Sequence, residues 1–186
     1  MNSTTTIKGL VLALFCFTGL NGFASAQEMP KPSPEHQILQ KEVGEWTAEI
    51  KIWGPGADEP WTSKGSDSTQ MLGEMWSVTE FKGDFFGMEA KGRGTFGFDP
   101  AKKKFAGTWV DSMSPYLTTM EGTYDKKTTT MTWVTLGTDQ ATGKLQKGKN
   151  VVKYIGTDQR VMTMYMELAG MDEMFKTLEI TYQRKK

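Results

Sequence analysis

The stretch Gly44-Glu45-Trp46-Thr47-Ala48-Glu49-Ile50-Lys51-Ile52 marks the point where the hydrophobic pattern of the chain changes. From Trp46 onward apolar and polar residues alternate, and this period of two predicts a β-strand with one buried face. Gly44 is predicted to end a preceding helix, because glycine readily adopts the left-handed backbone found at helix C-termini. The chain therefore divides here into a short helical segment and a long β region.

The helical segment is short but has clear boundary signals. Ser33 is a favourable N-cap, Pro34 suits the first helical position, and Glu35 lies beside the positive end of the helix dipole. A helix of about ten residues is marginal in isolation. We therefore expect it to pack against, or plug, one end of the β structure.

Alternating segments separated by tight turns continue to the C-terminus. The predicted strands are 46–52, 61–71, 75–85, 89–98, 105–111, 116–124, 129–136, 151–155, 160–168 and 175–184. Nearly all connections are hairpin-short, apart from a glycine-containing loop from Gly137 to Gly148. Parallel pairing needs long crossovers, and closure removes exposed sheet edges. The prediction is an all-β fold, an antiparallel up-and-down β-barrel of about ten strands with one short N-terminal helix, which can hold one small ligand.

The first 26 residues have the features of a signal peptide. Lys8 precedes an apolar run from Gly9 to Leu20, and Ala24-Ser25-Ala26 has the small-x-small pattern of a cleavage site. We expect cleavage after Ala26 and export to the periplasm or the extracellular space, with no stable membrane anchor. Residues 27–33 then form an extended arm, and 34–186 a single domain.

Composition narrows the range of partners. Cys16, the only cysteine, lies in the predicted leader, and Phe15 before it does not fit a lipoprotein signal. Loss of Lys8 with the leader leaves 21 of 22 basic residues against 22 acidic residues, a net charge of −1. This balance favours neither nucleic acid nor an anionic membrane, and it leaves the oligomeric state open.

Four ordered blocks resemble a known family. They are Pro-Ser-Pro-Glu-His (32–36) leading to Gly-Glu-Trp (44–46), Gly-Phe-Asp-Pro-Ala-Lys (97–102), Gly-Thr-Trp-Val-Asp-Ser-Met (107–113) and Tyr-Gln-Arg (182–184). The chain is similar to a bacterial family of mostly exported proteins, the domain of unknown function family 1579. The resemblance implies a lipocalin-like, calycin-type barrel in which the last-strand arginine, Arg184, packs over Trp46, with Gly44 opening the first strand. It brings no established catalytic residues.

Alternation places several aromatic, methionine and acidic residues on shared strand faces. If those faces point inward, they form a cavity suited to a small, largely apolar molecule. The candidates are Trp76, Glu80, Trp109, Asp111, Met120, Met131 and Trp133, with a further wall from Tyr165 or from the row Met162, Met164 and Met166. The alternative is that these side chains simply fill the barrel core.

The leading hypothesis is therefore ligand binding without catalysis, and two others stay open. Glu80 or Asp111 could act as a general acid or base in a small enzyme, or the barrel could be a filled structural or interaction module. His36 is the only imidazole and is expected outside the barrel. No His, Cys or carboxylate cluster has metal-ligand spacing, so we expect no metal and no cofactor.

Overall fold

The structure is a computed structural model that describes residues 31–168 and 170–186. The predicted signal peptide, residues 1–26, and residues 27–30 of the predicted arm lie outside the described residues. In the described part of the chain, no helix has the length and apolar character needed to cross a bilayer.

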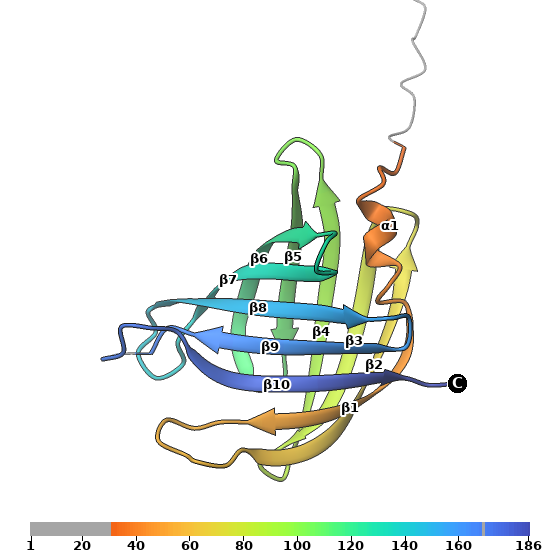
Figure 1. Ribbon diagram of the computed structural model, residues 1–186. Coiled ribbons are helices and arrows are strands. Elements are labelled where there is room, and N and C mark those ends of the chain that lie inside the picture. The colour runs from red at the N-terminus through yellow and green to blue at the C-terminus, as the bar shows by residue number, and fades with distance from the viewer. Residues whose placement is uncertain (1–30, 169) are drawn as a thin grey trace, which may run out of the picture. The chain divides into compact units, whose positions relative to one another are not determined.

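Within this part of the chain, ten antiparallel strands close into a barrel in sequence order (Figure 1). The strands are β1 (Gly44–Ile52), β2 (Trp61–Leu72), β3 (Trp76–Phe85), β4 (Met88–Asp99), β5 (Lys104–Asp111), β6 (Ser114–Asp125), β7 (Thr130–Thr138), β8 (Leu145–Ile155), β9 (Gln159–Met166) and β10 (Phe175–Arg184). The predicted up-and-down barrel is confirmed.

Strands β1 and β10 close the barrel. Trp46 lies opposite Arg184 in the antiparallel register, and the Arg184 guanidinium carbon lies 4.0 Å from the centre of the Trp46 ring. Gly44 has φ of 126°, and a Cβ added there would collide with Nη1 of Arg184. Glycine is therefore required at this position both for the backbone conformation and for the close approach of the arginine.

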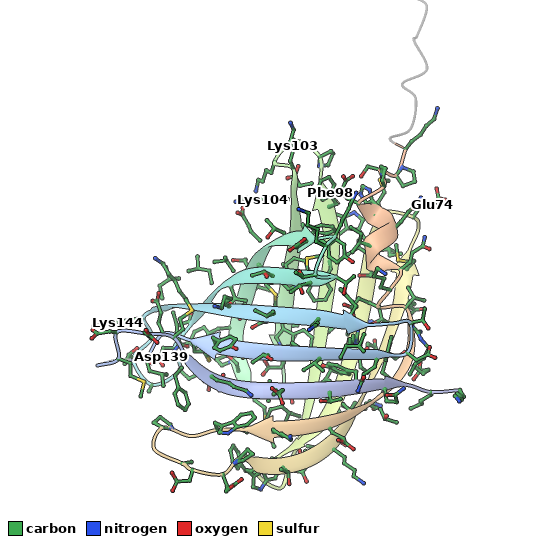
Figure 2. All side chains as sticks on the ribbon, viewed as in Figure 1. Glu74, Phe98, Lys103, Lys104, Asp139 and Lys144 are labelled. Atoms are coloured by element: carbon green, nitrogen blue, oxygen red, sulfur yellow. The ribbon has the colours of Figure 1, made fainter. Side chains whose placement is uncertain are left out.

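The up-and-down order gives the barrel two different ends. The β2–β3, β4–β5, β6–β7 and β8–β9 turns lie at the end where α1 (His36–Leu39) packs, which we call the α1 end. The other five connections lie at the opposite end, which we call the far end. Figure 2 shows Lys103 and Lys104 at the α1 end, and Asp139 and Lys144 at the far end.

Helix α1 is shorter than predicted. It spans four residues, and its N-cap is Glu35. No side chain caps it, so the prediction of Ser33 as the N-cap is wrong. Beyond Leu39 the chain continues in tight turns, in which the amides of residues 41–43 donate to carbonyls three residues earlier. These turns place Leu39 in the core and bring the Glu42 carbonyl to the Trp46 indole NH at 2.9 Å. Tertiary contacts thus override the local helix signals.

Strand β8 begins at Leu145 and not at Val151 as predicted, so the predicted loop from Gly137 to Gly148 is shorter. Its first half lacks an apolar alternation because the inward positions include Gly148 while Lys147 and Lys149 face away from the interior. Pairing with β7 and β9 holds this segment through backbone hydrogen bonds, which sequence hydrophobicity does not report.

Replacement of Gly44 tests the closure. We expect Gly44→Ala to lower the free energy of unfolding by about 3 kcal/mol, because a left-handed alanine is combined with displacement of Arg184. The control is Gly73→Ala, which also has positive φ, of 64°, but has open space around an added Cβ; it should cost about 1 kcal/mol. Equal losses in urea unfolding would show that the contact with Arg184 is unimportant.

Candidate functional site

Five of the predicted site residues face the barrel interior. They are Trp109, Asp111, Met120, Met131 and Trp133, and adjacent registers bring strands β5, β6 and β7 side by side. Met120, Met131 and Trp133 are buried in the apolar core, whereas Trp109 and Asp111 are half-buried. The predicted constellation is therefore divided between packed core and a more accessible region.

The inward placement predicted for Trp76, Glu80 and Tyr165 is wrong. Trp76 is 42% exposed and lies across Gly97 of the neighbouring strand, where an added Cβ would be 2.5 Å from its ring. The Glu80 carboxylate forms an exposed ion pair with Arg93 at 2.7 Å. Tyr165 faces outward, with the Lys149 ammonium 4.8 Å from its ring centre. The alternative row, Met162, Met164 and Met166, faces the interior.

Strand β3 shows why the alternation of residues assigned the wrong face to the interior. Its inner positions near the α1 end are Ser77 and Thr79, not the larger apolar residues Trp76 and Val78. Thr79 shares a hydrogen bond of 2.8 Å with Thr69 on β2, which satisfies both hydroxyls inside the barrel. The wide Trp76 ring fits outside because Gly97 provides a flat surface for it.

The two candidate acids do not form an acid–base pair in the interior. Asp111 accepts hydrogen bonds from the Trp109 indole at 3.1 Å and from the Met113 amide at 2.9 Å, which ties its carboxylate to the end of β5. Glu80, on the outer face, is held by Arg93. Both acids border one shallow pocket of about 320 Å³ over β3, β4 and β5.

The inner wall near the far end is unevenly covered. The inward side chains of Trp109, Met164 and Met166 are half-buried there, whereas Ile50 near the same end of the barrel, and Trp46 and Met131 closer to α1, are at most 1% exposed. Small residues line the adjoining wall of β6, β7 and β8, namely Thr118, Thr135, Gly137 and Gly148. Bulky apolar and small side chains thus lie side by side, with Trp109 paired to Thr118 and Met166 to Gly148.

Asn150 lies at the inner edge of this region. It is paired in register with Trp133 and Met164, is 7% exposed, and its side-chain oxygen has no hydrogen-bond partner among the described residues. Sequence reasoning missed it, although its alternation with Val152 and Tyr154 places a polar side chain on an apolar face. An unpaired buried amide is unusual in a folded protein and requires an explanation.

Exposed apolar side chains gather around the far end. Most of the large exposed hydrophobic residues belong to its turns or to the adjoining strand ends, namely Phe86, Met88, Val110, Met113, Tyr116, Leu117, Leu136, Leu145 and Met171. We call these residues the apolar rim. Contiguous exposed apolar surface is typical of binding sites.

The α1 end contains a buried ionic cluster that sequence reasoning also missed. Arg160 on β9 is almost fully buried and forms ion pairs with Glu42 and, at 3.0 Å, with Asp67 of β2. Its guanidinium carbon lies 4.5 Å from the ring centre of Trp46 and 4.3 Å from that of Tyr182. The signal in the sequence was an arginine in alternation with Met162 and Met164.

Burial shifts the ionisation of this cluster. It raises the pKa of Asp67 to about 7, while the hydrogen bond donated by Thr69 acts in the opposite direction. It lowers the pKa of Arg160 to about 10 and raises the pKa of Tyr182 above its ordinary value. Because each charge loses hydration, direct pairing within the cluster is what offsets the cost of burial.

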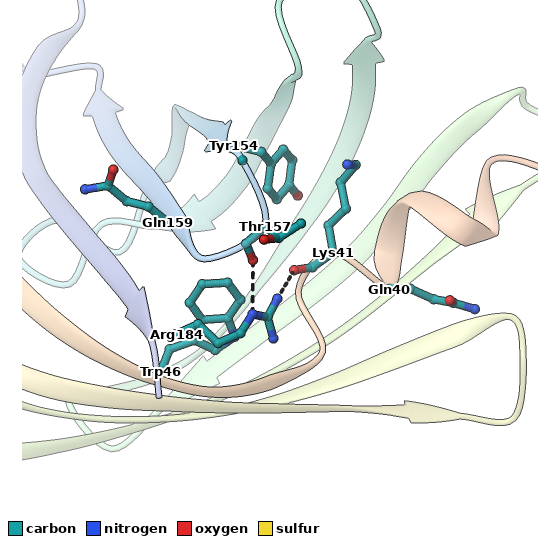
Figure 3. A pocket seen from close by; sticks show the side chains of 8 residues that line it. Gln40, Lys41, Trp46, Tyr154, Thr157, Gln159 and Arg184 are labelled. Atoms are coloured by element: carbon teal, nitrogen blue, oxygen red, sulfur yellow. Dashed lines mark hydrogen bonds between the residues drawn. The ribbon is translucent and has the colours of Figure 1, made fainter. Parts of the chain in front are cut away.

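Arg184 lies against Trp46, beside Lys41 and Thr157 (Figure 3). It donates to the carbonyls of Val43, of Thr157 at 3.0 Å and of Lys41 at 3.2 Å. These contacts form the wall of a pocket of about 260 Å³ beside Trp46. Because its guanidinium is occupied by backbone carbonyls, Arg184 joins the α1 segment to the barrel and is not available as an anion site.

His36 is buried, not on the surface. Its Nδ1 accepts a hydrogen bond from the Ser33 amide at 2.9 Å, and its ring packs edge-on against Phe98 with 5.8 Å between centres. These contacts make it part of the packing between α1 and β4. No three His, Cys, Asp or Glu side chains in the described ranges come together as ligands for a metal ion.

Removal of Arg160 tests the structural role of the ionic cluster. We expect Arg160→Met to lower the free energy of unfolding by about 3–5 kcal/mol, because Glu42 and Asp67 lose their cation in a buried site. The matched control is Arg93→Met, which breaks the exposed pair with Glu80 and should cost less than about 1 kcal/mol. Similar urea midpoints for the two variants would contradict this assignment.

Comparisons with known proteins agree with this fold. Rv2717c from M. tuberculosis superposes with a TM-score of 0.62 at 12% identity, over 84% of this chain and 100% of that chain. The S-type phycobiliprotein lyase CPES from Guillardia theta gives 0.54 at 11% identity, over 82% and 93%. A search of curated proteins gave no match. The model of the family described as "Protein of unknown function (DUF1579)" matches residues 31–184, and the chain belongs to that family.

Proposed function

We propose that the protein binds a small, largely apolar ligand inside the far end of the barrel, between the inner faces of β5 to β9. The observation that carries this proposal is the incomplete burial of the inward side chains Trp109, Met164 and Met166. Apolar surface left in contact with water has a free-energy cost of about 25 cal/mol per Å² that an apolar ligand would remove.

The adjoining wall supports the same proposal. Thr118, Thr135 and Gly148 are small, so they leave space on the inner wall beside Trp109 and Met166. Methionine side chains are flexible and polarisable, and they adapt to ligands of different shape. This chemistry favours a compact apolar molecule and does not require one particular ligand shape.

The apolar rim supplies a route to this region. Exposed groups such as Phe86, Leu117 and Met171 surround the end of the barrel at which the half-buried inner residues lie. A ligand approaching from water would contact apolar surface first and then the interior. The position of the rim at the far end, opposite α1, therefore supports ligand entry there.

The alternative functions receive less support. A general acid–base role needs an accessible acid in the site, whereas Glu80 lies on the outer face with Arg93, and Asp111 is held by Trp109 and Met113. A completely filled barrel does not account for the half-buried inner residues Trp109, Met164 and Met166 near the far end. The barrel fold is shared with a phycobiliprotein lyase, which is compatible with a functional interior, although at 11% identity the likeness concerns the fold.

We further propose that binding takes place after export. This rests on the leader-like pattern of residues 1–26, with its apolar run and the motif Ala24-Ser25-Ala26. The periplasm or the extracellular space would then be the source of the ligand.

Ligand binding can be measured with pyrene, a hydrocarbon dye whose emission reports an apolar environment. We expect pyrene to bind the wild-type protein, and Thr135→Trp to weaken binding by about tenfold or more because the new ring occupies the space beside Met166. The matched control is Val134→Trp, on the next residue, whose side chain faces outward and is 59% exposed; it should bind pyrene as the wild type does.

Native mass spectrometry of protein purified from its own host provides a second measurement, because a bound ligand adds mass. The proposal fails if the wild type neither binds pyrene nor carries an added mass. It also fails if Thr135→Trp and Val134→Trp bind the dye equally well, since the dye would then lie outside the barrel.

A further inference from the structure

We infer that Asn150 is the polar anchor of the site and that the ligand carries a neutral hydrogen-bond donor, such as an alcohol or an amide N–H, on an apolar body. This inference rests on the proposed function and defines the class of ligand. Its starting point is the side-chain oxygen of Asn150, which is buried without a partner among the described residues.

The surroundings of Asn150 determine where a partner can reach it. Toward α1 the next inward residue on β8 is Val152, which is buried in the core with Met131. Toward the far end the next inward residues on β7 and β8 are Thr135 and Gly148, both small. A hydrogen-bonding group therefore reaches the amide from the far end, which places the apolar body of the ligand against Trp109 and Met166.

The free-energy cost of leaving the Asn150 side chain unpaired explains why a ligand contact there would add affinity. A buried amide that loses its bonds to water is destabilising until another group replaces them. The unpaired atom is the side-chain oxygen, which accepts, so an alcohol or an amide N–H of the ligand can donate to it. A ligand that supplies this bond gains affinity over an isosteric hydrocarbon.

Charge excludes anionic ligands from the same region. Among the described strands, the inward positions carry two cations, Arg160 and Arg184. Both lie at the α1 end, where Arg160 pairs with Asp67 and Arg184 donates to backbone carbonyls. The inward charge nearest the far end is Asp111, an acid. A carboxylate beside Asn150 would therefore be buried without a counter-ion, which is strongly unfavourable. The site should prefer a neutral ligand over a fatty acid anion.

A matched pair of ligands tests this preference in the wild-type protein. Displacement of pyrene by 1-decanol is compared with displacement by decanoate at neutral pH, because the two share a chain length and differ in the charge of the head group. We expect half-displacement at a concentration about tenfold lower, or more, for decanol. Equal potency, or a preference for decanoate, would overturn the inference.

A variant of Asn150 then tests whether the binding of decanol depends on this residue. In Asn150→Leu, the dissociation constant of decanol relative to that of pyrene should rise about 3–10-fold, because decanol loses a hydrogen bond that the hydrocarbon never makes. The control is Ser77→Ala. Like Asn150, Ser77 has a buried side-chain oxygen without a partner on the inner wall, but it lies near the α1 end. It should change the affinity of neither pyrene nor decanol.

The outcomes separate the inference from the proposed function. If the wild type does not bind pyrene, both fail. If pyrene binds and Asn150→Leu leaves displacement by decanol unchanged, the site exists but Asn150 does not anchor its ligand. Pyrene binding by Asn150→Leu also reports that the variant is folded, and the comparison of decanol with decanoate needs no variant.

Discussion

The guanidinium of Arg160 joins parts of the chain that are far apart in sequence. It contacts Glu42 before the first strand, Asp67 on β2, and the rings of Trp46 on β1 and Tyr182 on β10. A buried cation with this set of partners tolerates few alternative arrangements, because displacement of any strand would leave charge unpaired. Arg160 thus links the closure of the barrel to Glu42 in the segment before β1, and Arg184 completes the same end over Trp46.

The two halves of the barrel differ in the interactions that stabilise their interiors. At the α1 end, charge pairing, aromatic rings and Leu39 fill the interior, and the contacts are specific and mutually dependent. At the far end, the inner wall combines methionines and Trp109 with small residues, and polar pairing is sparse. A fold whose closure is secured at one end can leave the other end incompletely packed, which is where the proposed ligand and Asn150 lie.

One property of residue alternation explains both the site residues that were placed on the correct face and those that were not. Alternation correctly grouped Trp109, Asp111 and Trp133 on inner faces, because apolar residues there do face the core. It failed on β3, where Ser77 and Thr79 face inward and Trp76 covers Gly97 outside. A period of two identifies two faces, but it does not say which face is inside when small polar residues line the interior and an outward glycine receives an aromatic ring.

The sequence by itself determined the strand number, the antiparallel order and the closure of the sheet, because these follow from local periodicity, short turns and the cost of exposed edges. It also marked Gly44 and Trp46 as the start of the barrel. Only the tertiary structure decided that Arg160, Asp67 and Glu42 meet, that β8 starts at Leu145, and that Asn150 is left without a partner. These features depend on pairing between residues distant in the chain, and local patterns carry no information about which distant charges or amides will meet.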